Sequence, residues 1–346
     1  MDKKDEIILQ QLETIRTMTE RNLRSMGGDF WGTPFENVTG APEKKPASKD
    51  GGGKPAAAQP AEKKADEPEP LPKENLADLQ AELDSYIGLA DVKEEVKNLI
   101  NMVNVYKLRR AHDLPTTDMS LHMVFTGNPG TGKTMMARMM ARIYRSLDIL
   151  SKGQLVEVDR SGLVAGYVGQ TALKTQKVIE KAMGGVLFID EAYALNGKSE
   201  NDFGQEAIDT ILKAMEDHRD DLVVIVAGYT DLMEKFIHSN PGLESRFNRF
   251  LLFEDYSPDE MLAIFRMQCK KGCYQLAEGT EELVRDYINE ENGDPETFGN
   301  ARGVRNCFEH ILVAQNNRLA AMESVTKDDL MTIITDDVLY ARGKLD

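Results

Sequence analysis

In the middle of the chain, short runs of consecutive apolar residues alternate with longer segments whose apolar residues recur at helical spacing. Five short apolar runs stand between turn signals, as is typical of buried strands. Helical patterns, among them residues 92–111, 135–147 and 171–183, lie before and between these runs. This alternation predicts an α/β fold in which helices flank both faces of a parallel sheet. The five runs are residues 121–126, 154–158, 186–189, 222–227 and 250–253.

The two ends of the chain have different patterns. From Pro258 onward only helical patterns follow, so we expect a small all-α domain after the α/β domain. Apolar residues share one face over residues 4–26, whereas residues 41–72 are rich in Lys, Pro, Ala, Glu and Gly and cannot bury enough apolar surface to order themselves. The predicted parts are an amphipathic helix (1–28), a flexible linker that starts with an aromatic segment (29–73), the α/β domain (74–255) and the helical domain (256–346).

The segment Gly127–Thr134 fits G-x-x-x-x-G-K-[ST], the pattern of a phosphate-binding loop, or P-loop. It follows a predicted strand and precedes a predicted helix, which is the context that the motif needs. The backbone N–H groups of such a loop cradle phosphate oxygens, and the positive end of the helix points at the same place. Lys133 would add a charge on the β- and γ-phosphates, and Thr134 a hydroxyl ligand for Mg²⁺. The other expected nucleotide contacts are Asn128, Pro129, Gly130, Thr131 and Gly132.

The predicted strand 186–189 ends in two acids, Asp190 and Glu191. Carboxylates at the carboxyl end of a parallel strand lie where such sheets bind ligands. Asp190 is expected to hold Mg²⁺ directly or through water, and Glu191 to act as general base for an attacking water. The second acid favours ATP hydrolysis, and the lack of an N-K-x-D sequence argues against a GTPase. Thr230, which follows another predicted strand, either orients this water or caps a helix.

Composition restricts the classes of partner. A formal net charge of −16 argues against broad attraction to nucleic acid or to anionic membrane. No apolar run approaches the length of a membrane span, and the N-terminal residues lack a signal-peptide core. The three cysteines have no metal-ligand spacing, and Cys269 and Cys307 fall within helical apolar stripes, which indicates buried free thiols. We therefore expect a soluble protein of a reducing compartment, the cytoplasm.

Five ordered motifs support a resemblance to a known family. From about Leu83 to Ala341 the chain resembles AAA+ ATPases, and among them the group of CbbX and stage V sporulation protein K. The resemblance implies a P-loop NTPase sheet, a small all-α lid after it, and ATP with Mg²⁺ as ligands. The motifs are Gly127–Thr134 (Walker A), Phe188–Leu195 (Walker B), Ala227–Asp231, Asn240–Phe247 and Gly299–Arg305.

The resemblance implies further contacts to the nucleotide within one subunit. Ile87 and Gly88 would pack against the adenine. Thr230 would be the sensor 1 residue, which favours the catalytic reading of that threonine over the helix cap. Arg302 would be the sensor 2 residue and swing in from the lid, and Arg305, one turn further on, would share that role.

The resemblance also implies that subunits act on each other. Arg246, with Arg249 as the other candidate, would be an arginine finger that reaches the γ-phosphate of the neighbouring subunit. The segment 162–170 looks like the first pore loop of the family, in which Tyr167 and Val168 would face the central channel of a hexamer and Tyr167 would grip a polypeptide. A tyrosine packed on the domain surface is the alternative.

These expectations combine into an ATP-driven homo-oligomeric ring motor, a hexamer by family habit, that remodels or threads a protein client. A remodeller of the rubisco-activase CbbX type and a nucleotide-dependent assembly scaffold remain alternatives. A type VII secretion ATPase is disfavoured because the usual N-terminal helical-repeat domain is missing. A DNA motor is disfavoured by the acidic charge and by the lack of a C-terminal DNA-binding module.

Overall fold

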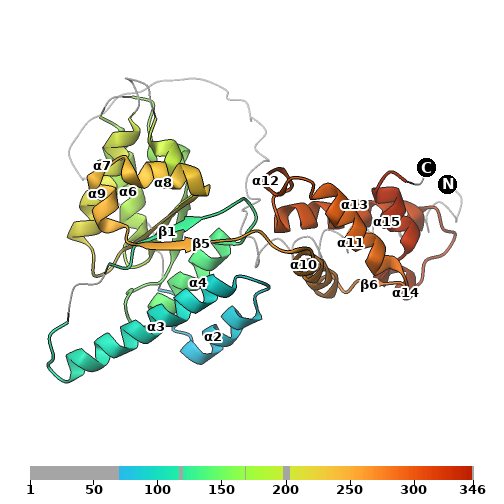
Figure 1. The fold of residues 1–346 in the computed structure, drawn as a ribbon, viewed down its shortest axis with the longest axis horizontal. Helices are drawn as coiled ribbons and strands as arrows, with labels where there is room; N and C mark the ends of the chain where they lie inside the picture. The colour runs from blue at the N-terminus through green and yellow to red at the C-terminus, as the bar shows by residue number, and fades with distance from the viewer. Residues whose placement is uncertain (1–69, 117–119, 168, 198–202, 345–346) are drawn as a thin grey trace, which may run out of the picture.

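The computed structural model describes residues 70–116, 120–167, 169–197 and 203–344. An α/β core and a helical lid lie side by side and are joined by the segment between β5 and α10 (Figure 1). The predicted N-terminal helix and all of the predicted linker up to residue 69 lie outside the described residues.

The core is a five-stranded sheet in the order β2-β3-β4-β1-β5, and every adjacent pair is parallel. Thr126, the last residue of β1, pairs with Gly228, the last residue of β4, so the carboxyl ends of these strands meet at one edge. The α/β fold class predicted from the apolar runs is therefore confirmed. The strands are β1 (Met123–Thr126), β2 (Leu155–Val158), β3 (Val186–Ile189), β4 (Val223–Gly228) and β5 (Arg249–Leu252).

Helices bury both faces of this sheet (Figure 1). Alternate strand residues point to opposite faces, so Phe125 joins a core cluster with α2, α3 and α4, whereas Val124 joins one with α6, α7, α8 and α9. The helices of the core are α2 (Leu76–Ser85), α3 (Ala90–Ala111), α4 (Lys133–Ser146), α5 (Arg160–Leu163), α6 (Thr171–Ala182), α7 (Gly204–Asp217), α8 (Thr230–His238) and α9 (Pro241–Arg246), with a 3₁₀ turn η1 (Ala192–Leu195).

The lid begins with a well-defined helix start. Ser257 and Glu260 form a capping box at the N-terminus of α10, and Pro258 occupies its first turn. The centre of the lid is apolar, with the rings of Phe265 and Phe308 packed edge to face at 5.4 Å. Its helices are α10 (Pro258–Lys271), α11 (Thr280–Glu291), α12 (Pro295–Phe298), α13 (Ala301–Ala320), α14 (Lys327–Met331) and α15 (Thr335–Ala341).

The lid differs from the sequence expectation in one detail. The short strands β6 (Gln275–Leu276) and β7 (Thr332–Ile333) pair in parallel, whereas the sequence predicted helical segments alone. A strand of two residues is too short to show the period-2 alternation of apolar and polar positions. Tertiary packing brings these two strands together, so the local sequence pattern does not reveal them.

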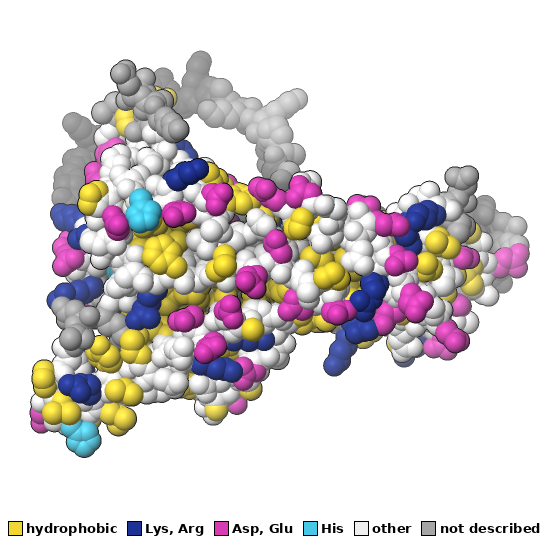
Figure 2. All heavy atoms as spheres, in the orientation of Figure 1, with side chains coloured by type: hydrophobic (Ala, Val, Ile, Leu, Met, Phe, Trp, Pro, Cys, Tyr) yellow, Lys and Arg dark blue, Asp and Glu magenta, His cyan; other side chains and the backbone are white. Residues whose placement is uncertain are grey.

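Two surface properties follow from the structure. Acidic side chains are spread over both the core and the lid on the face shown in Figure 2, in keeping with the net charge of −16. No helix in the described part of the chain is both long and apolar enough to cross a membrane.

Candidate nucleotide-binding site

The P-loop connects the end of β1 to α4, which begins at Lys133 rather than at the predicted Met135. Its glycines take backbone angles that other residues avoid: φ is +140° at Gly127 and +72° at Gly130. Both also lie against other backbone, since a Cβ at Gly127 would stand 2.2 Å from the Phe253 carbonyl oxygen and one at Gly130 would stand 2.1 Å from that of Gly299. The sequence therefore folds this way only with glycine at these two positions.

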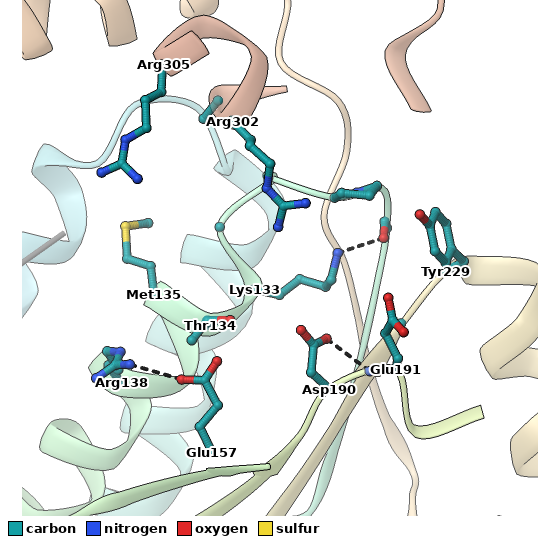
Figure 3. Close-up of a pocket in the computed structure, with 16 residues that line it drawn as sticks. Lys133, Thr134, Met135, Arg138, Glu157, Asp190, Glu191, Tyr229, Arg302 and Arg305 are labelled. Carbon is teal, nitrogen blue, oxygen red and sulfur yellow. Dashed lines mark hydrogen bonds and ion pairs between the residues drawn. The ribbon is translucent and has the colours of Figure 1, made fainter. Parts of the chain in front are cut away.

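A cavity of about 390 Å³ lies over the loop. Core and lid both line it: Lys133 and Thr134 come from the P-loop, Asp190 and Glu191 from the end of β3, and Arg302 from the lid helix α13 (Figure 3). The structure thus brings together the predicted phosphate, metal, base and sensor 2 residues around one space. Of the other predicted contacts of the P-loop, Pro129, Gly130 and Gly132 also line the cavity.

Asn128 and Thr131 support the loop from behind. The Asn128 amide donates to both carboxylate oxygens of Asp255, at 3.1 and 2.9 Å. The hydroxyl of Thr131, which is fully buried, donates to the Asn128 carbonyl at 2.8 Å. Neither residue is among those that line the cavity, so their side chains hold the shape of the loop.

Lys133 lies within the loop rather than in solvent. Its ammonium donates to the carbonyl oxygens of Gly127 and Asn128, each at 2.7 Å. Burial lowers the pKa of Lys133 to about 8, although the nearby Asp190 carboxylate acts in the opposite direction. A partly buried cation with three N–H groups would gain from an anion that shares its site.

The two acids after β3 both reach the cavity but differ in their local contacts. Asp190 accepts a hydrogen bond from the backbone N–H of Glu191 at 3.0 Å, and both carboxylates lie on the side of the cavity that faces Lys133 (Figure 3). Glu191 has left-handed backbone angles, φ 48° and ψ 42°. Such angles are uncommon outside glycine and gather at functional sites. They turn the Glu191 side chain toward Tyr229, which directly follows β4 (Figure 3).

A third acid in the cavity was missed by the sequence analysis. Glu157 lies in β2, and its carboxylate accepts a hydrogen bond from Arg138 of α4 at 3.0 Å (Figure 3). Burial raises the pKa of Glu157, and the charge of Asp190 adds to this rise. An acid inside the otherwise apolar run Leu155–Val158 was the signal that could have indicated it. Arg138, four residues after Thr134, lies on the same helix face.

Two lid arginines reach the cavity from the first turns of α13. Arg302 points toward Lys133, and Arg305 points toward Met135 (Figure 3). The positive charge of Arg302 contributes to the lowered pKa of Lys133. Both guanidinium groups line the cavity above the P-loop, so both are placed to take an anionic ligand.

The residues present fit a nucleoside triphosphate with Mg²⁺. The N-terminus of α4 has no side-chain cap, which leaves its first N–H groups for phosphate oxygens beside the Lys133 ammonium. Among the described residues no group of three or more His, Cys, Asp or Glu side chains is arranged to hold a metal ion. A Mg²⁺ bound by Thr134 and Asp190 would therefore take its other ligands from phosphate and water, as this ion commonly does.

Several predicted site residues lie outside the cavity. Ile87 packs, partly buried, against the lid core, and Gly88, with φ +64°, lies against Tyr256 and Glu260. Thr230 is the exposed first residue of α8, whereas its neighbour Tyr229 lines the cavity. Tyr229, the residue between β4 and α8, is thus the one that the structure itself places near Glu191.

The residues predicted to act between subunits also lie away from their own cavity. Arg246, at the end of α9, pairs with Glu216 of α7 at 3.3 Å. The Nε–H of Arg249 donates to the Ser120 carbonyl at 3.1 Å. Tyr167 has 73% of its surface exposed, and Val168 lies outside the described residues.

Family models and individual known proteins match most of this chain. The model of the ATPase family associated with various cellular activities (AAA) matches residues 123–255, and an AAA lid model matches residues 257–345. The chloroplastic ribulose bisphosphate carboxylase/oxygenase activase of Cyanidioschyzon merolae is 44% identical over 272 residues, which are 78% of this chain and 92% of that protein. Stage V sporulation protein K of Bacillus subtilis is 40% identical over 265 residues, 76% of this chain and 82% of that protein.

A solved structure supports the fold independently. The FIGL-1 AAA domain superposes with a TM-score of 0.53 at 17% identity, over 76% of this chain and 83% of that one. At this identity the likeness concerns architecture alone. The relatives that match most of their own length show the family: the chain belongs to the AAA family of ATPases, in the group that contains CbbX, CfxQ and stage V sporulation protein K.

Proposed function

We propose that this protein binds and hydrolyses ATP at the P-loop cavity and uses the cycle to remodel or thread a protein client. The observation that carries the proposal is the convergence of Lys133, Asp190, Glu191 and Arg302 on one cavity of about 390 Å³. Each of these side chains has a distinct charge or proton-transfer role in phosphoryl transfer.

Each cavity residue has a separate task in this proposal. The N–H groups of the P-loop and the Lys133 ammonium hold the phosphates, while Thr134 and Asp190 hold Mg²⁺, which when bound neutralises charge on the phosphate oxygens. Glu191 takes a proton from the attacking water. Arg302 and Arg305 extend from the lid, and their guanidinium groups bind the negatively charged phosphates.

Three further roles rest on the family resemblance. Ile87 and Gly88 contact the adenine, and their place between core and lid supports this assignment. Thr230 is the sensor 1 residue, although Tyr229 is the one that lines the cavity. Because of this difference, sensor 1 should be tested at both positions.

The active unit is an oligomer, a hexamer by family habit. Arg246, or Arg249 as the second candidate, completes the site of the neighbouring subunit, which agrees with its position outside its own cavity. Tyr167 extends from the segment between α5 and α6 and contacts the client polypeptide, in keeping with its 73% exposure. Val168 shares that loop.

The client is a protein rather than a nucleic acid or a membrane. One relative is named a rubisco activase, which makes a rubisco-activase-type remodeller the second candidate function. An assembly scaffold without processive work is the third. We further propose a cytoplasmic location, and the four-part division into residues 1–28, 29–73, 74–255 and 256–346.

The experiment that tests the proposal is the ATPase rate of the full-length protein as a function of its concentration. A site shared between subunits predicts that the rate per subunit rises with concentration and reaches a plateau as oligomers form. A constant rate per subunit on dilution to the monomer would reject the shared site. Lys133→Ala, as a binding-deficient control, excludes a contaminating ATPase.

A further inference from the structure

Three successive carbonyl oxygens of the P-loop accept hydrogen bonds from the lid side of the molecule. The Pro129 carbonyl accepts from the Asn300 side chain at 3.3 Å, and the Gly130 carbonyl from the backbone N–H of Ala301 at 3.3 Å. The Thr131 carbonyl accepts from the Tyr256 hydroxyl, also at 3.3 Å. Asn300 and Ala301 stand at the start of the lid helix α13, and Tyr256 lies in the segment immediately before α10.

Asn300 is the centre of this contact. It is fully buried, and its amide oxygen accepts the backbone N–H of Tyr256 at 2.9 Å. Its amide nitrogen donates to Asp255 at 2.7 Å as well as to Pro129. Since Asn128 donates to the same Asp255 carboxylate, two amides and one carboxylate join the P-loop, the interdomain segment and the lid.

The backbone of Asn300 is held in a conformation that other structures reserve for glycine. Its φ is 53° and its ψ is −125°, outside the three regions open to residues with a side chain. An asparagine persists there only where its surroundings over-determine it. This turn directs the N–H of Ala301, the first residue of α13, to the Gly130 carbonyl. The strained backbone at Asn300 therefore stands directly beside the contact between the lid and the P-loop.

Peptide geometry connects this contact to the nucleotide. Each peptide unit is a rigid plane whose C=O and N–H point in opposite directions. The Pro129 and Gly130 carbonyls that face the lid therefore share planes with the N–H groups of Gly130 and Thr131. If phosphate oxygens fix those N–H groups, the same planes fix the carbonyls that the lid contacts.

We propose that Asn300, anchored by Asp255, is the positioning residue that couples phosphate occupancy of the P-loop to the orientation of the lid. This inference rests on the proposed ATP binding at the loop. It differs from the sensor 2 role of Arg302, because Arg302 senses charge across the cavity whereas Asn300 contacts the backbone of the loop itself.

The test is Asn300→Gly, since glycine tolerates the backbone angles while the side chain and its amide are removed. Hydrogen exchange is measured by mass spectrometry in the full-length protein, with and without ADP and Mg²⁺. In the wild type we expect protection of peptides that cover both 127–134 and 299–308. In Asn300→Gly the protection of 127–134 should remain, whereas that of 299–308 should be lost.

Steady-state kinetics give a second readout. Asn300→Gly should lower kcat about tenfold, within the range of ordinary couplings between sites, while KM for ATP stays nearly constant. Asn306→Gly is the matched control, because Asn306 is exposed on α13, the helix that Asn300 precedes, and the same residue is introduced. It should keep both protections and the wild-type kcat. A thermal melt of each variant confirms folding.

The outcomes separate the inference from the function on which it rests. If ADP leaves the 127–134 peptide of the wild type unprotected, nucleotide binding at the loop is wrong. If that peptide is protected and Asn300→Gly still transmits protection to 299–308, the coupling role of Asn300 is wrong. Equal losses in Asn300→Gly and Asn306→Gly would also overturn it, because they would reflect a general loosening of α13.

Discussion

Arg246 Nη2 lies 3.3 Å from a carboxylate oxygen of Glu216, which joins the C-terminus of α9 to α7. The pair is weak, because 62% of the Glu216 side chain is exposed and the pair is screened by solvent. Within the described residues, the Nε of Arg246 is buried without a hydrogen-bond partner. The guanidinium also donates to the Gly242 carbonyl and to the Ser245 hydroxyl, each at 3.4 Å, so its own subunit holds it only by long contacts.

Replacement of this guanidinium should abolish turnover without affecting binding. We expect Arg246→Ala to bind a fluorescent ATP analogue as the wild type does, while kcat falls by about 10³–10⁵, the contribution of an arginine finger. Mixing it with Lys133→Ala should restore part of the activity, because some interfaces then combine an intact P-loop with an intact finger. Arg249→Ala is examined in parallel. Rescue by mixing for Arg249→Ala alone would transfer the finger role to Arg249.

Glu191 should be needed for hydrolysis and not for binding. Glu191→Gln keeps the shape of the side chain but removes the base, so we expect kcat to fall by about 10²–10⁴ while ATP affinity is retained. Oligomers should persist in ATP, which size-exclusion chromatography detects. Glu206→Gln, on α7 and outside the cavity, is the matched control and should hydrolyse normally. Undiminished turnover in Glu191→Gln would exclude this residue as the base.

The pKa of Lys133 predicts a pH dependence of nucleotide affinity. Its value of about 8 means that the free protein loses the ammonium charge as the pH rises through 8. Binding of a polyanion to the charged form then requires proton uptake, so the affinity should fall by up to about tenfold per pH unit above that value. Isothermal titration calorimetry in buffers of different ionisation enthalpy measures the proton directly.

Lys133→Arg tests the assignment of that proton, because a guanidinium stays charged at every pH in the range. Its affinity is expected to be lower but flat between pH 7 and about 9.5. A wild-type affinity that shows no decline over the same interval would contradict the titration of Lys133.

The exposed ring of Tyr167 should serve client contact rather than chemistry. Tyr167→Ala should keep the basal ATPase rate, and any stimulation of that rate by unfolded, reduced and carboxymethylated lactalbumin should disappear. Tyr340→Ala in α15 is the control, because this lid tyrosine is also exposed, at 48%. Stimulation that survives in Tyr167→Ala would favour the scaffold function or another contact residue.

The sequence predicted those parts of the site that local pattern determines. The P-loop and the acids Asp190 and Glu191 each follow directly after a strand, so their position at the end of a parallel sheet follows from topology. The structure confirms the sheet and places these residues around one cavity. The choice of Thr230 rather than Tyr229 rested on a motif, and one position along a strand end decides which side chain faces the cavity.

Other parts depend on contacts between distant segments and left little local signal. Asn300 looks like an ordinary helix-flanking residue until its amide is seen between Asp255 and Pro129. Likewise, the pairing of Glu157 with Arg138 requires that β2 and α4 lie side by side. Periodicity predicts which elements form, but not which of their polar side chains meet.

Glu157 gives a prediction in which stability and binding change in opposite directions. Its folded-state pKa lies above its ordinary value of 4.5, mainly because of burial. The folded protein therefore binds more protons than the unfolded one above pH 4.5, and the free energy of unfolding falls as the pH rises through that window. A neutral isostere should relieve this cost, so Glu157→Gln is expected to melt at a temperature equal to or above that of the wild type at pH 7.5.

The same substitution should impair Mg²⁺-dependent binding. The charged form of Glu157 lowers the stability of the folded protein, and an acid retained at such a cost beside Thr134 and Asp190 indicates a role in the site. Affinity for ADP is compared with Mg²⁺ and with EDTA. In the wild type Mg²⁺ should strengthen binding, and in Glu157→Gln this gain should shrink while the EDTA value stays close to wild type. Arg138→Gln is the control, because it breaks the ion pair between Arg138 and Glu157 but keeps the Glu157 carboxylate. An unchanged Mg²⁺ gain in Glu157→Gln would show that the acid serves only to hold Arg138.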